Sequence, residues 1–222
     1  MYKTLEAYMQ SCMEDSAHDA QHVYRVLYYA MDIARDAKQV DYDVLITACL
    51  LHDIGRKEQF EDPAVCHAAA GAQKAKQFLQ SLGSNEEFIQ KVCHCIATHR
   101  YSKKAPAQTL EAKILFDADK LDVAGAAGIA RTLLYQGTMG QSLYTLNDKG
   151  LVSDGTGDAV PSFFQEYQRK LANLYDGFLT DRGKEMAQQR QRAALDFYRA
   201  LYEEMNHGYL YGKVFLRQHL EE

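Results

Sequence analysis

The sequence contains no tryptophan and only three prolines among its 222 residues. Proline interrupts helices because it lacks a backbone N–H and clashes with the preceding turn. The prolines stand at positions 63, 106 and 161, so they leave long stretches in which apolar residues recur at helical spacing. We therefore expect an all-α protein.

Long apolar runs are also missing. No stretch approaches the about 18 uncharged apolar residues of a membrane span, and residues 1–6 lack the basic-then-apolar layout of a signal peptide. The five cysteines, an odd number, lie within helical patterns, which favours reduced thiols over a disulfide framework. We therefore expect a cytoplasmic protein that does not bind membranes.

The chain has no excess of positive charge. Its formal net charge is −5, which argues against broad binding to nucleic-acid backbones, although a small basic pocket could still hold a phosphate group. The hydrophobic content of 47% is sufficient for a substantial core. The composition thus predicts a globular protein whose partner is a small molecule rather than a nucleic-acid polymer.

Helical periodicity begins after Asp19, a candidate N-cap, and continues over most of the chain. The predicted helices cover residues 20–34, 42–51, 64–82, 85–99, 110–116, 123–135, 162–175 and 181–205. No linker separates two halves, so we expect a single domain over residues 1–222. Its C-terminal helices would occupy residues 162–222. The tail, residues 208–222, is expected to be a short helix that docks or mediates association, which leaves a homodimer open.

Residues 137–161 interrupt this pattern with five glycines, several polar residues and no sustained period. A loop of this length without secondary structure is usually functional or disordered. Its length and composition suit a mobile cover over a site.

A histidine and an aspartate, His52 and Asp53, end the apolar run of residues 46–51. Adjacent side chains on a helix point about 100° apart, so both can reach one ion only where the last turn loosens, and Gly55 permits this. The alternative is an ordinary helix-end histidine, favoured by the helix dipole, beside a solvated carboxylate. A choice between them requires further ligands.

Six of the eight histidines fall within the first 99 residues. Imidazoles and carboxylates together bind first-row divalent ions, and facing helices of a bundle can bring such side chains onto one ion. Spacing alone does not compel a particular set. The candidate ligands are His22, His52, Asp53 and Asp119. His67 and His99 could instead be core histidines satisfied by backbone partners. His94 carries no motif, and we expect it to be structural.

Three motifs in this chain resemble the H…HD…D signature of the HD-domain metal-dependent phosphohydrolase superfamily. They are His18-Asp19-x-x-His22-x-x-Arg25-Val26, Leu50-Leu51-His52-Asp53-Ile54-Gly55 and Asp117-Ala118-Asp119-Lys120-Leu121-Asp122, followed by Gly125 and Gly128-Ile129-Ala130-Arg131. Two further segments, His67-Ala68-x-x-Gly71-Ala72 and Ile96-x-x-His99-Arg100, are similar to a small stand-alone branch of predicted HD hydrolases. The core motifs span residues 18–131, and the similarity extends over roughly residues 16–200.

The resemblance implies a single-domain, all-α HD-type helical bundle that holds a divalent ion (Mg, Mn, Co, Ni, Fe or Zn). The implied metal ligands are His22, His52, Asp53 and Asp119. We choose Asp119 over Asp117 because the last ligand of the family stands in an Ala-Asp-x-Leu context; Asp117 and Asp122 would support the ligands or cap helices. The catalytic residues would be Asp53 and His99, and the substrate-binding residues His18, His67, Arg100, Lys120, Lys170 and Arg190.

The chain departs from the family pattern at two positions. Arg56 stands where several relatives have an acidic residue near the attacking water, so that acid/base role does not transfer. Glu166 stands where relatives often have a histidine shortly before the Lys170-Leu171 pair.

A divalent ion in this ligand set would lower the pKa of a bound water and polarise a phosphoryl oxygen. We therefore expect hydrolysis of an ester or anhydride bond in a small phosphorylated metabolite, with a nucleotide preferred. One alternative is an HD-type di-iron oxygenase, in which His67, His94 and His99 supply ligands for a second metal. The other is a metal-binding sensor without turnover.

Overall fold

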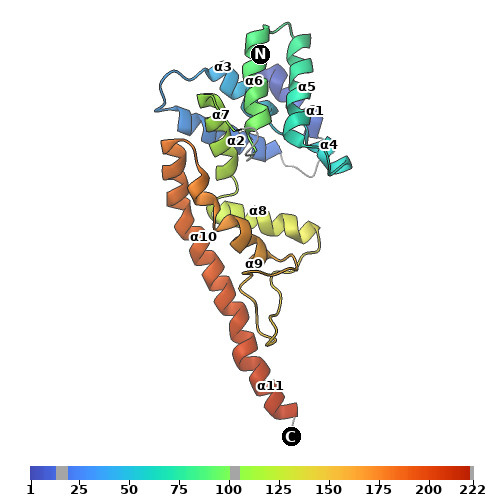
Figure 1. The fold of residues 1–222 in the computed structure, drawn as a ribbon, viewed down its shortest axis with the longest axis vertical. Coiled ribbons are helices and arrows are strands. Elements are labelled where there is room, and N and C mark those ends of the chain that lie inside the picture. The colour runs from blue at the N-terminus through green and yellow to red at the C-terminus, as the bar shows by residue number, and fades with distance from the viewer. Residues whose placement is uncertain (14–19, 101–105, 221–222) are drawn as a thin grey trace. The chain divides into compact units, whose positions relative to one another are not determined.

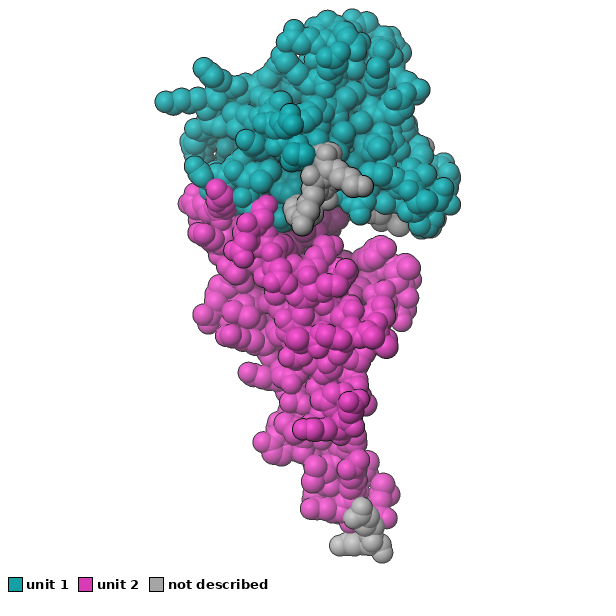
Figure 2. Space-filling view, viewed as in Figure 1, with its two compact units in different colours: residues 1–122, 178–183 teal, residues 123–177, 184–222 magenta. Residues whose placement is uncertain are grey.

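The computed structural model describes residues 1–13, 20–100 and 106–220 (Figure 1). Within these residues the regular structure is helical, with two isolated bridges, Ser142 to Ser162 and Leu146 to Val152, and no strand. The all-α prediction is confirmed. The chain divides into two compact units, one of residues 1–122 and 178–183 and one of residues 123–177 and 184–222 (Figure 2). The expectation that they act as one domain stays a prediction.

The first unit is a bundle in which α3 is central. α3 packs against α1, α2, α6 and α7, and six of its ten side chains are apolar and buried. A helix that is apolar around most of its circumference must lie inside a protein, which is the position α3 takes. The helices of this unit are α1 (Tyr2–Met13), α2 (Ala20–Ala34), α3 (Tyr42–Leu51), α4 (Arg56–Glu61), α5 (His67–Ser81), α6 (Glu86–Thr98) and α7 (Leu110–Leu121).

Side-chain caps fix where several of these helices begin. The carboxylate of Asp41 accepts from Val44 N (3.1 Å), the amide oxygen of Asn85 from Phe88 N (2.8 Å), and the Thr109 hydroxyl from Ala112 N (3.2 Å). Each such cap is worth about 1 kcal/mol. The predicted starts of α3, α6 and α7 agree with these caps to within one residue.

Other boundaries differ from the predictions. Two helices, α1 and α4, were not expected. The helix predicted over residues 64–82 begins at His67, after the turn that contains Pro63. α7 continues to Leu121 rather than ending at residue 116, because Asp117 stays in the helix and turns its carboxylate to a distant segment.

Gly55, two residues after Asp53, allows two backbone segments to pack closely. Its φ is −95°, which other residues adopt readily. A Cβ at this position would lie 2.3 Å from the carbonyl oxygen of His67 and 2.4 Å from the backbone nitrogen of Gly71. The missing side chain therefore lets the turn after α3 touch the start of α5, which brings His67 toward Asp53.

We expect Gly55→Ala to destabilise the protein by about 1–3 kcal/mol, because the new methyl group must push apart two backbone segments. The free energy of unfolding from chemical denaturation measures this loss. Gly137→Ala is the matched control, because a Cβ there meets nothing within 4 Å. Equal stability of the two variants would contradict the packing role of Gly55.

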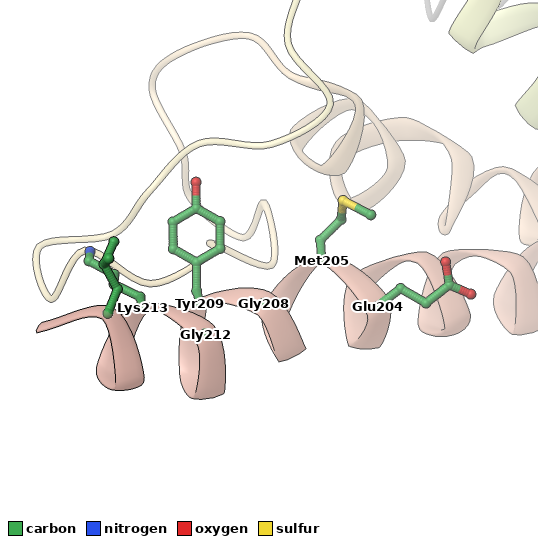
Figure 3. Close-up of a pocket in the computed structure, with 7 residues that line it drawn as sticks. Glu204, Met205, Gly208, Tyr209, Gly212 and Lys213 are labelled. Atoms are coloured by element: carbon green, nitrogen blue, oxygen red, sulfur yellow. The ribbon is translucent and has the colours of Figure 1, made fainter. Parts of the chain in front are cut away.

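The second unit contains α8 (Gly125–Thr138), α9 (Phe163–Glu166) and most of α10 (Asp181–His207). A π-helical stretch (Tyr167–Leu171) follows α9, and another (Gly208–Gly212) joins α10 to α11 (Lys213–Leu220). A hollow of about 420 Å³ lies beside this second stretch. It is lined by Glu204, Met205, Gly208, Tyr209, Gly212, Lys213 and Leu216, and Figure 3 gives a close-up of it.

The glycine-rich segment of this unit has hydrogen bonds of its own. Thr145 and Ser153 donate to the carboxylate of Asp158 at 2.5 and 2.7 Å, and the Tyr198 hydroxyl of α10 donates to the carbonyl of Asp154. Its action as a mobile cover stays a prediction. Among the helices of the described residues, none combines the length and apolar character that a membrane span requires.

Candidate metal centre

The structure brings together the four side chains predicted as metal ligands. His22 lies in the first turn of α2, His52 ends α3, Asp53 follows it, and Asp119 lies near the end of α7. His22 Nε2 is 3.3 Å from His52 Nε2, 3.3 Å from Asp119 Oδ1 and 3.4 Å from Asp53 Oδ2. His52 Nε2 is 3.7 Å from Asp53 Oδ2. Each therefore points a potential ligand atom at one small volume.

Two further imidazoles approach the other oxygen of the same aspartate. His67 Nε2 and His99 Nε2 each lie 3.7 Å from Asp53 Oδ1 and 3.2 Å from one another. Asp53 is thus a buried carboxylate between two pairs of histidines. The sequence singled out His67 and His99 without predicting that they share Asp53; their substrate-binding and catalytic roles stay predictions.

Hydrogen bonds at Nδ1 orient the imidazole rings. In the rings of His22, His52 and His99, Nδ1 contacts a carboxylate or backbone carbonyl oxygen, which can only accept, so Nδ1 carries the proton. In a neutral ring this leaves Nε2 with a free lone pair. His67 Nδ1 lies near both Gln59 Oε1 and the donor Arg56 NH1, the latter at 3.3 Å. The Nδ1 contacts are His22 to Asp122 Oδ2 (2.7 Å), His52 to Cys49 O (2.8 Å), His67 to Gln59 Oε1 (2.9 Å) and His99 to Ile96 O (2.6 Å).

The donor set fits a divalent cation. Asp53 Oδ2 is buried and has no hydrogen-bond partner among the described residues. A carboxylate oxygen and a neutral imidazole nitrogen are both acceptors, so their approach is favourable only where a proton or a metal ion lies between them. Imidazole and carboxylate together suit first-row transition metals.

The charges at the centre also favour the binding of a cation. Burial lowers the pKa of His52 to about 4, so that ring is neutral near pH 7. Burial also lowers the pKa of His22, but the nearby carboxylates of Asp119, Asp122 and Asp53 outweigh it and raise the value to about 11. Burial raises the pKa of Asp53, but His52, His22 and Arg56 hold it well below its usual range. The cluster therefore attracts positive charge.

Asp117, the neighbouring candidate that we did not choose, faces a different segment. Its Oδ1 accepts from Leu179 N at 2.8 Å, and its Oδ2 accepts from Thr180 N at 2.7 Å and from the Thr180 hydroxyl at 2.6 Å. It thereby fastens residues 178–183 to α7. Asp119 reaches the imidazoles, whereas Asp117 stabilises the fold.

Arg56 lies beside the centre rather than in solvent. Its Nε donates to Asp53 Oδ1 at 2.9 Å, and its NH1 donates to Gln59 Oε1 at 3.3 Å. The guanidinium therefore fixes the same carboxylate oxygen that faces His67 and His99.

The other predicted substrate residues differ in position. Lys120 lies over the rings of Phe116 and Phe178, at 5.1 and 5.4 Å from their centroids, and burial lowers its pKa. Arg100 follows His99 and is exposed. His18 lies outside the described residues.

Lys170 and Arg190 belong to the second unit, where Lys170 Nζ lies 3.6 Å from Glu166 Oε1 and Arg190 packs against Gly125. Their roles stay predictions. The backbone N–H of Gln108 donates to His94 Nε2 at 3.3 Å, so this imidazole has the backbone partner of a structural histidine.

Comparison with known proteins identifies a family model and a relative that matches over most of the chain. Residues 19–124 match the model of the HD domain family. The chain is 29% identical to the uncharacterized protein YpgQ of Bacillus subtilis (strain 168) over 203 residues, which cover 89% of this chain and 90% of YpgQ.

Solved structures similar to this chain include that relative and an HD-superfamily hydrolase. The crystal structure of Bacillus subtilis YpgQ in complex with ADP superposes with a TM-score of 0.71 at 26% identity and covers 92% of this chain and 98% of that one. A crystal structure of an HD-superfamily hydrolase from Bacillus thuringiensis has a TM-score of 0.69 at 26% identity, with coverage of 92% and 96%.

Proposed function

The chain is an HD-domain protein, and from this premise we propose that it is a metal-dependent phosphohydrolase acting on a small phosphorylated metabolite, with a nucleotide as the preferred class. The observation that carries the proposal is the buried carboxylate of Asp53, whose unpartnered Oδ2 faces the Nε2 atoms of His22 and His52. The relative YpgQ was crystallised with ADP, which supports a nucleotide.

In this proposal His22, His52, Asp53 and Asp119 hold the ion. A divalent ion bound there supplies a water of lowered pKa and polarises a phosphoryl oxygen. Asp122 orients His22 and also accepts from Arg25 Nε at 2.7 Å, so its charge is balanced when the site is loaded. Asp53 Oδ2 serves as ligand, while Oδ1 is held by Arg56.

The phosphate would be held by positively charged side chains. Two carboxylate ligands leave a divalent site nearly neutral, so a substrate with several negative charges needs further positive groups. Lys120 follows Asp119 directly, and Arg100 follows His99. Lys170 and Arg190 remain candidates from the second unit.

We expect Lys120→Met or Arg100→Met to weaken substrate binding or turnover by about 1.5–3 kcal/mol, the scale of a hydrogen bond to a charged group. Metal content should be unchanged. Steady-state kinetics and elemental analysis of the same preparations measure both quantities. Full activity in these two variants and in the corresponding variants of Lys170 and Arg190 would show that the anion is held elsewhere.

Metal binding should release protons. Without a metal, His22 retains a proton because its pKa is raised to about 11, so an ion that binds Nε2 at pH 7–8 must displace about one proton. The apparent metal affinity therefore rises with pH, by up to about tenfold per pH unit, and falls in acid. Calorimetric titration in two buffers of different ionisation enthalpy measures the release, and identical heats would contradict it.

A hydrolysis panel tests the proposal. Metal-stripped protein is incubated with nucleoside mono-, di- and triphosphates and Mg, Mn, Co or Ni, and ³¹P NMR distinguishes released phosphate from pyrophosphate. Hydrolysis of one class with one of these ions is expected. No turnover under any condition would favour the sensor alternative.

The oxygenase alternative has one observation in its favour, the second imidazole pair of His67 and His99 at Asp53 Oδ1. An oxygenase would contain two irons and consume oxygen. Oxygen uptake by the iron-loaded protein would support it, whereas hydrolysis without oxygen uptake supports the proposal.

A further inference from the structure

Arg56 contacts the candidate metal centre with only part of its guanidinium group. This group has five N–H donors. Nε donates to Asp53 Oδ1 at 2.9 Å, and NH1 donates to Gln59 Oε1 at 3.3 Å and lies 3.3 Å from His67 Nδ1. Within the described residues, NH2 and its two N–H donors have no hydrogen-bond partner. Two donors of a charged group therefore remain for a ligand beside Asp53.

The planar shape of the guanidinium decides where these two donors point. NH2 lies on the same edge as Nε, and one N–H of each runs in nearly the same direction, which is the fork that fits carboxylates and phosphates. Because the Nε–H bond points at Asp53 Oδ1, this N–H of NH2 points to the same side. The hydrogen bond from NH1 to Gln59 holds the plane in this orientation. The side chain of Arg56 is 23% exposed, so a solute can reach it.

Arg56 also carries a positive charge that a loaded centre does not neutralise. The charge of a divalent ion would be matched by the two carboxylate ligands, Asp53 and Asp119. Arg25 donates to both oxygens of Asp122, at 2.7 and 3.2 Å, so the charges of that pair cancel as well. The charge of Arg56 is then left over beside Asp53, where it attracts an anion.

One phosphoryl group can contact the ion and Arg56 together. The ion would lie at Asp53 Oδ2, which faces His22 and His52, and the guanidinium lies at Oδ1, so the two cations flank a single carboxylate. The oxygens of a phosphoryl group also share one central atom, so one of them can bind the ion while another accepts from NH2. The charge of Arg56 acts inside the centre, because burial and Arg56 together lower the pKa of His67 to about 3.

We propose that Arg56 is a substrate-binding residue, whose NH2 donates to a phosphoryl oxygen of the substrate while Nε stays bonded to Asp53. The guanidinium then stabilises the negative charge that builds on this phosphoryl group as the bond breaks. An acidic residue at this position, as in several relatives, would repel the same oxygen. The inference rests on the proposed function in taking a divalent ion at Asp53 and a phosphorylated substrate.

Metal affinity distinguishes this role from a purely structural one. If Arg56 only positioned Asp53 for the ion, loss of the guanidinium would weaken metal binding. In the proposed role its loss removes a positive charge beside a cation, so metal affinity should stay the same or rise by up to about tenfold. Phosphate affinity should fall in the same variant.

The test uses the metal-stripped full chain, Mn²⁺ and inorganic phosphate as the probe. EPR of the free ion measures Mn²⁺ affinity. Broadening of the ³¹P signal measures phosphate affinity of the Mn²⁺-loaded protein, because bound Mn²⁺ broadens only a phosphate that lies close to it. Wild-type protein should bind phosphate, and Arg56→Met should bind it about 10–100-fold more weakly, the scale of a hydrogen bond to a charged group. Arg56→Lys keeps the charge and should recover part of the affinity.

Lys57→Met is the matched control, because it removes an exposed positive charge from the next residue of α4. Both affinities should stay near wild type in this variant. Equal phosphate affinity of Arg56→Met and wild type, no phosphate binding by wild type, or loss of Mn²⁺ binding in Arg56→Met would each overturn the proposal.

The nucleotide panel separates this proposal from the proposed function. Equal hydrolysis by wild type and Arg56→Met would refute the role of Arg56 alone. Phosphate binding that depends on Arg56, without hydrolysis of any nucleotide, would refute the proposed function alone.

Discussion

Asp53→Ala is expected to abolish divalent-metal binding and hydrolysis together while the helical fold is retained. Its Oδ2 faces the imidazole nitrogens of His22 and His52, so the substitution removes a charged ligand from the middle of the proposed centre. Loss of a group that merely orients a ligand costs about 10–100-fold in metal affinity, so loss of a direct, charged ligand should cost more than about 100-fold. Elemental analysis, calorimetry and the hydrolysis assay measure the three quantities on one preparation.

The fold should survive because the substitution also removes a buried oxygen that has no hydrogen-bond partner among the described residues. Asp53 Oδ2 is buried without a partner, and its removal leaves no comparable orphan except Arg56, whose side chain is 23% exposed and can be hydrated. His52→Ala provides an independent test, since it deletes a neutral ligand without changing the charge of the carboxylates. Metal content and turnover equal to wild type in either variant would refute the assignment of the centre.

Asp119→Asn and Asp117→Asn are expected to affect different properties, metal affinity and stability respectively, although the two residues are only two positions apart. Asp119→Asn removes a charged ligand and should lower metal affinity by roughly 100-fold with little change in stability. Asp117→Asn places an amide against the N–H groups of Leu179 and Thr180 and should cost about 1–3 kcal/mol of stability. Metal affinity should stay near wild type in this second variant.

Calorimetric metal titration and chemical denaturation of both variants measure the two effects. The comparison contains its own control, because each variant is the reference for the property that the other loses. A larger loss of metal affinity in Asp117→Asn than in Asp119→Asn would mean that the last ligand has been assigned to the wrong aspartate.

Individual helices could be predicted from the sequence because their formation depends mainly on residues that are neighbours along the chain. The range predicted for α3 is the observed one, since Asp41 caps its start and its apolar run ends at His52. The helix predicted over residues 162–175 is not continuous: it changes to a π-helical stretch at Tyr167 and then to a 3₁₀ turn. In that stretch Tyr167 stacks on Tyr198 of α10, a distant contact that periodicity does not reveal.

In the candidate centre, too, some residues could be predicted from the sequence and others could not. Motif resemblance selected His22, His52, Asp53, His67, His99 and Asp119, whereas separations of 30 and 66 residues carry almost no information on their own. Among the groups that orient the rings, Asp122 was expected to support the ligands. Gln59 and the backbone carbonyl oxygen of Ile96 were not foreseen in that role, because Gln59 belongs to no motif and a motif does not show where a backbone carbonyl points. Arg56 was recognised only as a departure from the family pattern; its contact with Asp53 Oδ1 depends on the three-dimensional turn after α3.

The most direct test of the central claim, that the charged cluster at Asp53 binds a metal for phosphate hydrolysis, is a metal reconstitution followed by ³¹P NMR. Protein stripped by a chelator is mixed with increasing Mn²⁺, and hydrolysis of the best substrate from the nucleotide panel is recorded against bound metal. We predict no hydrolysis by the stripped protein and activity that rises in step with ions bound to the chain, with none in Asp53→Ala at any concentration. Hydrolysis by the stripped protein, or equal hydrolysis by Asp53→Ala, would contradict the account.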